Sequence, residues 1–167
     1  MALLVLLGYA LADTFIFKTE VYAGEPPVEI YVAGGLLVAA AAAFLLFRAR
    51  LPLYVCILLP VMFGLAFAAA SHPALLRINQ LTDMSGLARY IYVRQEDGRY
   101  LPENIGLPSL SRDYPPDYWA QFSPDSTYEF ELRKGGLGFW QLSEVPLKEA
   151  YHDYYETQRK ERGLREE

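Results

Sequence analysis

Two long apolar runs set the pattern of hydrophobic and polar positions along the chain. Residues 30–47 and 51–71 contain no charged side chain, and the connection between them holds Arg48 and Arg50. A helix needs about 20 apolar residues to cross roughly 30 Å of hydrocarbon, whereas soluble helices of that length usually carry a polar stripe. The pattern therefore predicts a hairpin of two transmembrane helices, with a buried hairpin in a large soluble core as the alternative.

The charges beside these runs predict their orientation. Short loops that are rich in arginine and lysine stay in the cytoplasm, and the connection carries Arg48 and Arg50. The flank before the first run is acidic, with Glu20, Glu25 and Glu29 against Lys18 alone. We therefore expect a protein of the bacterial inner (cytoplasmic) membrane whose C-terminal domain, from Arg77 onward, lies outside the cytoplasm.

The N-terminal segment allows two interpretations. Residues 1–17 are apolar except for Asp13, which is typical of a further transmembrane helix. Alternatively, the Ala-Leu-Ala at 10–12 resembles the cleavage site of a signal segment. No Lys or Arg precedes the apolar core, so we favour the helix. Depending on this segment, the chain is expected to have two to three transmembrane helices in a transmembrane region at 1–76. A separate domain follows at 77–167.

Small residues recur four apart on both runs. They are Gly35, Ala39 and Ala43 on the first run and Gly64 and Ala68 on the second. In lipid, helices associate through close packing at small residues, because apolar side chains gain little by leaving a hydrocarbon solvent. We expect these two faces to form the contact of the hairpin.

The second half of the chain predicts a small antiparallel sheet. Alternation is clearest at 127–134, where Tyr128 and its alternate neighbours face one way and charged residues face the other. Asp-Gly at 97–98 and Gly-Gly at 135–136 are typical of hairpin turns. The expected strands are 89–94, 99–101, 127–134 and 137–142. The fold class is therefore a membrane-anchored α+β protein with an extracytoplasmic sheet domain.

Helices and loops complete this expected fold. Pro146 is a favourable first residue for a C-terminal helix that reaches about Arg162. Residues 73–87 are expected to form a short interfacial helix that ends at Gly86. Residues 18–29 are expected to form an irregular loop, because Gly24 is followed closely by two prolines.

Prolines interrupt the segment from Glu103 to Asp125, which is otherwise rich in aromatic residues. Long irregular segments are usually functional or held by a partner, and tyrosine and tryptophan dominate interface hot spots. We expect a partner-binding surface with Arg112 at its polar rim. Its aromatic residues are Tyr114, Tyr118, Trp119 and Phe122. In the alternative, these rings fill the edge of the sheet, and Trp119 belongs to the domain's own core.

The sequence offers few groups for catalysis or metal binding. The histidines are His72 and His152, and the one cysteine is Cys56, so no Cys/His spacing typical of zinc is present. A formal net charge of −5 argues against nucleic acid as a partner. We expect no catalytic residues, no metal and no cofactor, and we expect that the chain is not an enzyme.

These features lead to one functional expectation and two alternatives. We expect a non-catalytic accessory or assembly subunit of an inner-membrane complex, whose partners are membrane lipids and other membrane-protein subunits. The first alternative is a stand-alone membrane-anchored binding protein of the immunity, exclusion or pilin-accessory type. The second, less favoured, is an enzyme that acts on lipid or glycan.

Overall fold

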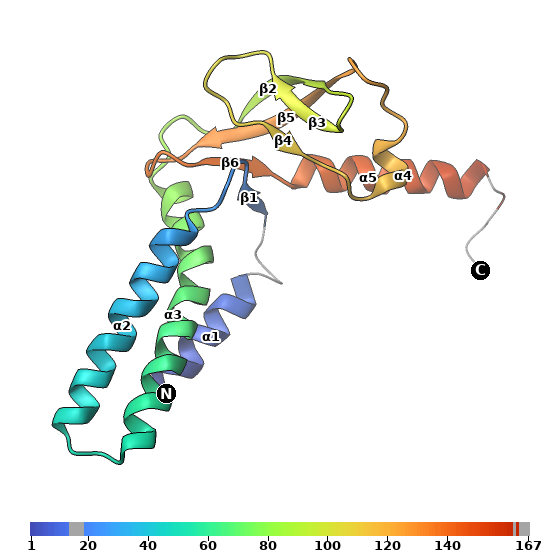
Figure 1. Ribbon diagram of the computed structural model, residues 1–167. Coiled ribbons are helices and arrows are strands. Elements are labelled where there is room, and N and C mark those ends of the chain that lie inside the picture. Colours follow the sequence, from blue (N-terminus) through green and yellow to red (C-terminus); the bar gives the residue numbers. More distant parts are fainter. Residues whose placement is uncertain (14–18, 162, 164–167) are drawn as a thin grey trace. The chain divides into compact units, whose positions relative to one another are not determined.

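The computed structural model describes residues 1–13, 19–161 and 163 and divides the chain into two compact units (Figure 1). The first unit comprises Met1–Lys18 and Glu25–Ile78. The second comprises Thr19–Gly24 and Asn79–Glu167.

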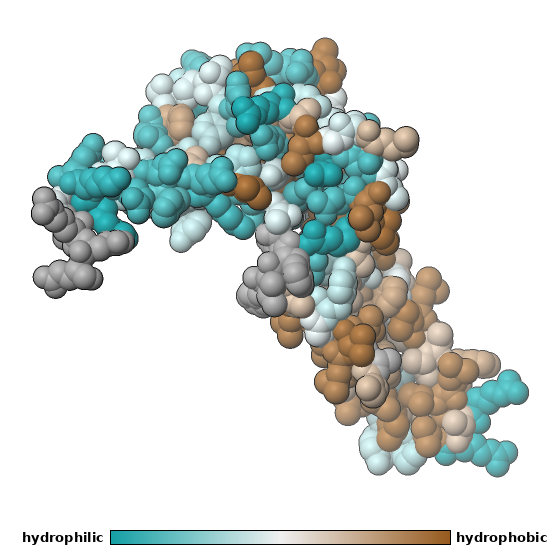
Figure 2. All heavy atoms as spheres, turned by 180° about the vertical axis from the view of Figure 1, so that it is seen from behind, coloured by the Kyte–Doolittle hydropathy of each residue, from teal (hydrophilic) through white to brown (hydrophobic). Residues whose placement is uncertain are grey.

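The first unit consists of helices. These are α1 (Ala2–Ala12), α2 (Val28–Arg48) and α3, which starts at Leu53 and continues to Leu81 at the start of the second unit. Both α2 and α3 are long and apolar enough to span a membrane. Only 11% of the most apolar stretch of α2 and 28% of that of α3 is buried, and Figure 2 shows hydrophobic side chains gathered over this hairpin. The two long helices of the predicted hairpin are therefore present, with apolar surfaces that remain exposed.

One helix prediction needs correction. Residues 73–81 are helical, as expected, but they are the last part of α3, which continues through Pro60 and Pro73 and ends at Leu81 rather than at Gly86. A proline removes one backbone donor from a helix, and α3, with 29 residues, retains many others. The described part of the helix expected at 1–17 is α1, Ala2–Ala12. Residues 14–17 lie outside the described residues.

The second unit is built on one antiparallel sheet, as predicted. Its strand order is β1-β6-β5-β2-β3-β4. The strands are β1 (Glu20–Tyr22), β2 (Ala88–Arg94), β3 (Arg99–Pro102), β4 (Leu110–Ser111), β5 (Thr127–Lys134) and β6 (Trp140–Ser143). The single turn α4 (Pro116–Trp119) and the C-terminal helix α5 (Val145–Glu161) complete the unit. Both predicted hairpins are present, and the predicted C-terminal helix begins one residue before Pro146.

The expectation of an irregular loop at 18–29 is wrong at Glu20–Tyr22. These residues form the edge strand β1, in which Glu20 pairs with Ser143 and Tyr22 pairs with Gln141 of β6. Three residues are too few to show an alternating pattern, and the partner strand lies near the other end of the chain. Local sequence rules therefore could not identify β1.

The two hairpins use the same turn geometry. Gly98 N donates to Gln95 O at 3.0 Å, and Gly138 N donates to Gly135 O at 2.9 Å. Gly98 and Gly138 have φ of +80° and +87°, a conformation that glycine adopts at low cost. The turns are therefore wider than the two-residue turns predicted at 97–98 and 135–136, and one glycine in each adopts the left-handed conformation.

The core lies on one face of the sheet. Phe130 and Leu132 of β5 are almost fully buried, as their alternate positions predict. From α5, Leu147 is buried and Tyr151 packs against the core. Tyr155, also on α5, is 42% exposed. The aromatic members of this core are Tyr92, Tyr100, Tyr118, Trp119 and Phe130, with Tyr128 packed against them.

Candidate functional site

The helical hairpin is closed by the small residues that the sequence singles out. A Cβ atom added to Gly35 would lie 2.8 Å from the carbonyl oxygen of Gly64 and 3.2 Å from Ala68 Cβ. One added to Gly64 would lie 2.7 Å from the carbonyl oxygen of Gly35 and 3.0 Å from Ala39 Cβ. The helix backbones thus approach too closely to admit side chains at either glycine. Ala43, one turn beyond Ala39, is half-buried.

Two apolar grooves flank this contact within the first unit. One has a volume of about 230 Å³ and is lined by residues of α2 and α3, including Gly35 and Gly64. The other, which we call the α1 groove, has a volume of about 410 Å³ and is lined by residues of α1, α2 and α3. An ion pair joins α1 to α3, with Arg77 Nε 2.7 Å from Asp13 Oδ1.

The residues that carry the topology prediction lie at the tip of the hairpin. Arg48 ends α2, Arg50 follows in the connection to α3, and both are exposed. Both arginine side chains are therefore accessible at this end of the first unit.

The structure places Tyr118 and Trp119 in the core of the second unit, with exposed fractions of 5% and 2%. The Trp119 ring lies 5.3 Å from the Tyr100 ring and 5.2 Å from the Tyr128 ring. Phe122 packs against the same core. This burial favours the core alternative for these three aromatic residues. Large aromatic side chains suit such a core because each buries much apolar area.

Tyr114 lies in the same segment but is 84% exposed. Core side chains hold the backbone beneath it: Trp119 Nε1 donates to Tyr114 O at 3.1 Å, and Tyr151 OH donates to the same oxygen at 3.4 Å. Tyr154 OH donates to Asp117 O at 3.1 Å. The neighbouring Arg112 is half-buried. A fixed backbone therefore presents one large aromatic side chain to solvent.

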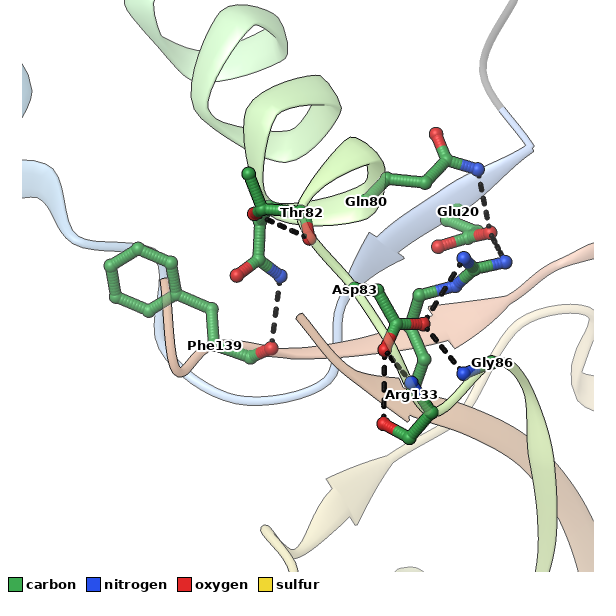
Figure 3. Close-up of polar contacts among 9 residues, drawn as sticks. Glu20, Gln80, Thr82, Asp83, Gly86, Arg133 and Phe139 are labelled. Carbon is green, nitrogen blue, oxygen red and sulfur yellow. Dashed lines mark hydrogen bonds and ion pairs between the residues drawn. The ribbon is translucent and has the colours of Figure 1, made fainter. Parts of the chain in front are cut away.

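A buried polar network, which sequence reasoning missed, lies on the other face of the sheet (Figure 3). Arg133 of β5 contacts Glu20 Oε1 at 2.9 Å and Asp83 Oδ2 at 3.3 Å. Gln80 Nε2 donates to Glu20 Oε1 at 3.0 Å. The side chains of Arg133, Glu20 and Asp83 are 16%, 8% and 1% exposed. One cation therefore links β1, β5 and the segment after α3.

Asn79 fixes the end of α3 to the β5–β6 turn. Its Nδ2 donates to Phe139 O at 3.0 Å, and its Oδ1 accepts from Leu137 N at 3.0 Å. A Cβ atom at Gly135 would lie 2.2 Å from the Asn79 side chain, so the close approach of Asn79 requires glycine there. The Gly-Gly pair at 135–136 was the only sequence signal for this contact, and it indicated a turn without indicating a partner.

Hydrogen bonds and burial shift several pKa values in the second unit. The pKa of Asp83 lies below its usual range, first because Ser85 N donates to it and further because of the Ser85 hydroxyl, Arg133 and Gly86 N. Burial raises the pKa of Tyr92 and of Tyr100 to about 12. Burial, with a hydrogen bond to Tyr118, also raises the pKa of Tyr128 above its usual value. The network carboxylate is thus held ionised, and the core tyrosines are held neutral.

We compared the chain with models of protein families, with curated proteins and with solved structures. None of them matches. Within residues 1–13, 19–161 and 163, no cluster of three or more His, Cys, Asp or Glu side chains is placed to hold a metal ion. We therefore infer a function from three features: the hairpin surface, the exposed Tyr114 and the polar network.

Proposed function

We propose that this chain is a non-catalytic accessory or assembly subunit of a bacterial inner-membrane complex. Its helical hairpin docks among partner helices in the bilayer, and its α+β domain binds a partner protein outside the cytoplasm. The exposed apolar surface of α2 and α3 supports the first contact. The charges of Arg48 and Arg50 support the orientation.

The exposed side chain of Tyr114 supports the second contact, between the α+β domain and a partner protein. Binding residues are often presented on loops by a rigid scaffold, and tyrosine loses little rotamer entropy when it is buried by a partner. The carbonyl oxygens of Tyr114 and Asp117 accept hydrogen bonds from core aromatic residues, so the loop is ordered before binding. Tyr114 therefore takes the role expected of the whole aromatic segment, with Arg112 at its rim.

Co-purification after mild solubilisation tests this proposal. The wild-type chain is expected to isolate with a stoichiometric membrane partner, and Tyr114→Ala is expected to weaken that complex by about 2 kcal/mol, as at an interface hot spot. Tyr155→Ala is the matched control, because Tyr155 is a partly exposed tyrosine on α5. If the complex tolerates Tyr114→Ala as well as Tyr155→Ala, the contact is elsewhere. If no stoichiometric partner isolates, the chain is a stand-alone binding protein instead.

A reporter fused to the C-terminus tests the orientation separately. A fluorescent protein that matures only in the cytoplasm is expected to stay dark after residue 167. Bright fluorescence would place the α+β domain in the cytoplasm and would redirect the search to cytoplasmic partners.

A further inference from the structure

Arg112 lies beside Tyr114 at the edge of the domain core. It directly follows β4, two residues after the buried Leu110, and side chains two apart along a strand point to the same face. Its charge acts on the hydroxyl of Tyr151, because burial raises the pKa of that tyrosine and Arg112 opposes the rise. The same hydroxyl donates to Tyr114 O at 3.4 Å. Arg112 and Tyr114 therefore belong to one surface of the second unit.

The charge of Arg112 has no counterpart within the described residues. None of the ion pairs in that part of the chain includes Arg112, and its Nε is buried there without a hydrogen-bond partner. The adjacent carboxylate, Asp113, accepts from Ser111 Oγ at 3.4 Å instead. Buried donors nearly always have partners, so the unpaired Nε of Arg112 is an exception that needs a reason.

A shortage of carboxylates does not explain this exception. The chain holds 20 Asp and Glu residues against 15 Lys and Arg residues. Three other arginines of the second unit, Arg89, Arg99 and Arg133, each contact a carboxylate at 3.0 Å or less. Arg112 is half-buried, so part of this unpaired cation remains accessible beside the exposed Tyr114.

We propose that Arg112 binds the carboxylate of an Asp or Glu side chain of the partner protein, beside the ring of Tyr114. The inference rests on the proposed function, in which Tyr114 contacts that partner. A guanidinium group binds a carboxylate through two parallel hydrogen bonds, and this contact pairs the charge that the described chain leaves without a counterpart. A phosphorylated side chain carries about −1.5 to −2 charges at pH 7, more than one arginine balances, whereas a carboxylate carries one.

Partner retention by the full chain after mild solubilisation tests this contact. Arg112→Gln removes the charge and keeps a long polar side chain, and it is expected to lower the retained partner about tenfold or more. Arg89→Gln makes the same change at an arginine that is 71% exposed and paired with Glu131, and it is expected to retain the partner. Near-ultraviolet circular dichroism checks the fold of both variants. Equal retention by Arg112→Gln and Arg89→Gln overturns the proposal.

Arg112→Lys identifies the group on the partner while it keeps the positive charge. A carbodiimide joins an amine to a neighbouring carboxylate as an amide and takes up the water that is lost. The amine introduced at position 112 is expected to become joined to an Asp or Glu of the partner, which mass spectrometry of the digested product locates. A crosslink only to carboxylates of this chain, or no crosslink at position 112, overturns the proposal.

Isolation of the wild-type chain separates this inference from the proposed function. A wild-type chain that isolates without a stoichiometric partner overturns the proposed function, and this inference with it. A chain that isolates with its partner and keeps it after Arg112→Gln loses only this inference.

Discussion

The helical hairpin and the α+β domain are packed by side chains of opposite size. In the hairpin, the contact is made by the smallest side chains, at Gly35 and Gly64, while Leu36 and Phe44 are 66% and 65% exposed. In the domain, the contact is made by the largest side chains, and Trp119 is 2% exposed. The two units therefore pack by different means, at glycine in the hairpin and at large aromatic rings in the domain, which are the means that apolar and aqueous surroundings respectively favour.

The polar residues differ between the two units in the same sense. The domain buries a charged network around Arg133, and its outer strand face also carries exposed charges such as Arg89. The apolar stretches of α2 and α3 contain no charged residue between Ile30 and Phe47 or between Leu51 and Ser71. A substitution that disturbs the packing of one unit should therefore destabilise that unit and leave the other intact.

The largest effect is expected for Trp119→Ala. Removing this ring leaves a cavity in the aromatic core, which typically lowers the free energy of unfolding by about 3–5 kcal/mol. Denaturant titration in detergent, followed by near-ultraviolet circular dichroism of the domain, measures the loss. Tyr114→Ala removes a ring that is 84% exposed and should cost less than about 0.5 kcal/mol. An unchanged free energy of unfolding after Trp119→Ala would mean that the core does not depend on this ring.

A second large effect is expected for Arg133→Ala. It leaves the carboxylates of Glu20 and Asp83 without their shared cation, and breaking a buried ion pair from one side costs about 3 kcal/mol or more. Arg89→Ala is the control on the same sheet. Its side chain is 71% exposed in a surface pair with Glu131, so its loss should cost about 0.5 kcal/mol. The same titration compares them, and equal costs would show that the network adds nothing beyond a surface pair.

A smaller effect, confined to the hairpin, is expected for Gly35→Leu. The new Cβ would meet the Gly64 carbonyl oxygen at 2.8 Å, so the helices must separate. Overpacking of this kind typically costs about 1–3 kcal/mol. Crosslinking between cysteines introduced on α2 and α3 reports the separation. Gly8→Leu is the control, because a Cβ there meets nothing within 4 Å. Normal crosslinking in Gly35→Leu would place the contact elsewhere.

The smallest effect on stability at neutral pH is expected from ionisation of the core tyrosines. The folded-state pKa of Tyr92 and of Tyr100 is raised to about 12 from 10.0. Their contribution to stability is therefore complete below pH 10 and declines as the pH rises from 10 to 12. Absorbance titration of phenolate should show these tyrosines ionising only as the domain unfolds. The hairpin should keep its helical circular dichroism between pH 10 and 12, and loss of hairpin helix in that range would contradict this separation.

Several parts of this protein follow from the sequence by itself. The uncharged runs predict α2 and α3 because their length and apolar composition are local properties. The period of two between Thr127 and Lys134 predicts β5 and its buried face for the same reason. Small residues four apart predict the close approach of Gly35 and Gly64, since that spacing places them on one side of a helix.

Other parts depend on contacts between distant segments, and only the tertiary structure decides them. β1 exists because β6 offers Glu20–Tyr22 a partner. Trp119 lies in the core because strands and α5 surround it, while its sequence neighbours fit a surface loop equally well. Asn79, Asp83 and Arg133 gain partners only when residues 79–83 lie beside β5 and the β5–β6 turn within the second unit. Periodicity indicates which face of a segment can be buried. Which other segment covers that face is decided only when the whole chain folds.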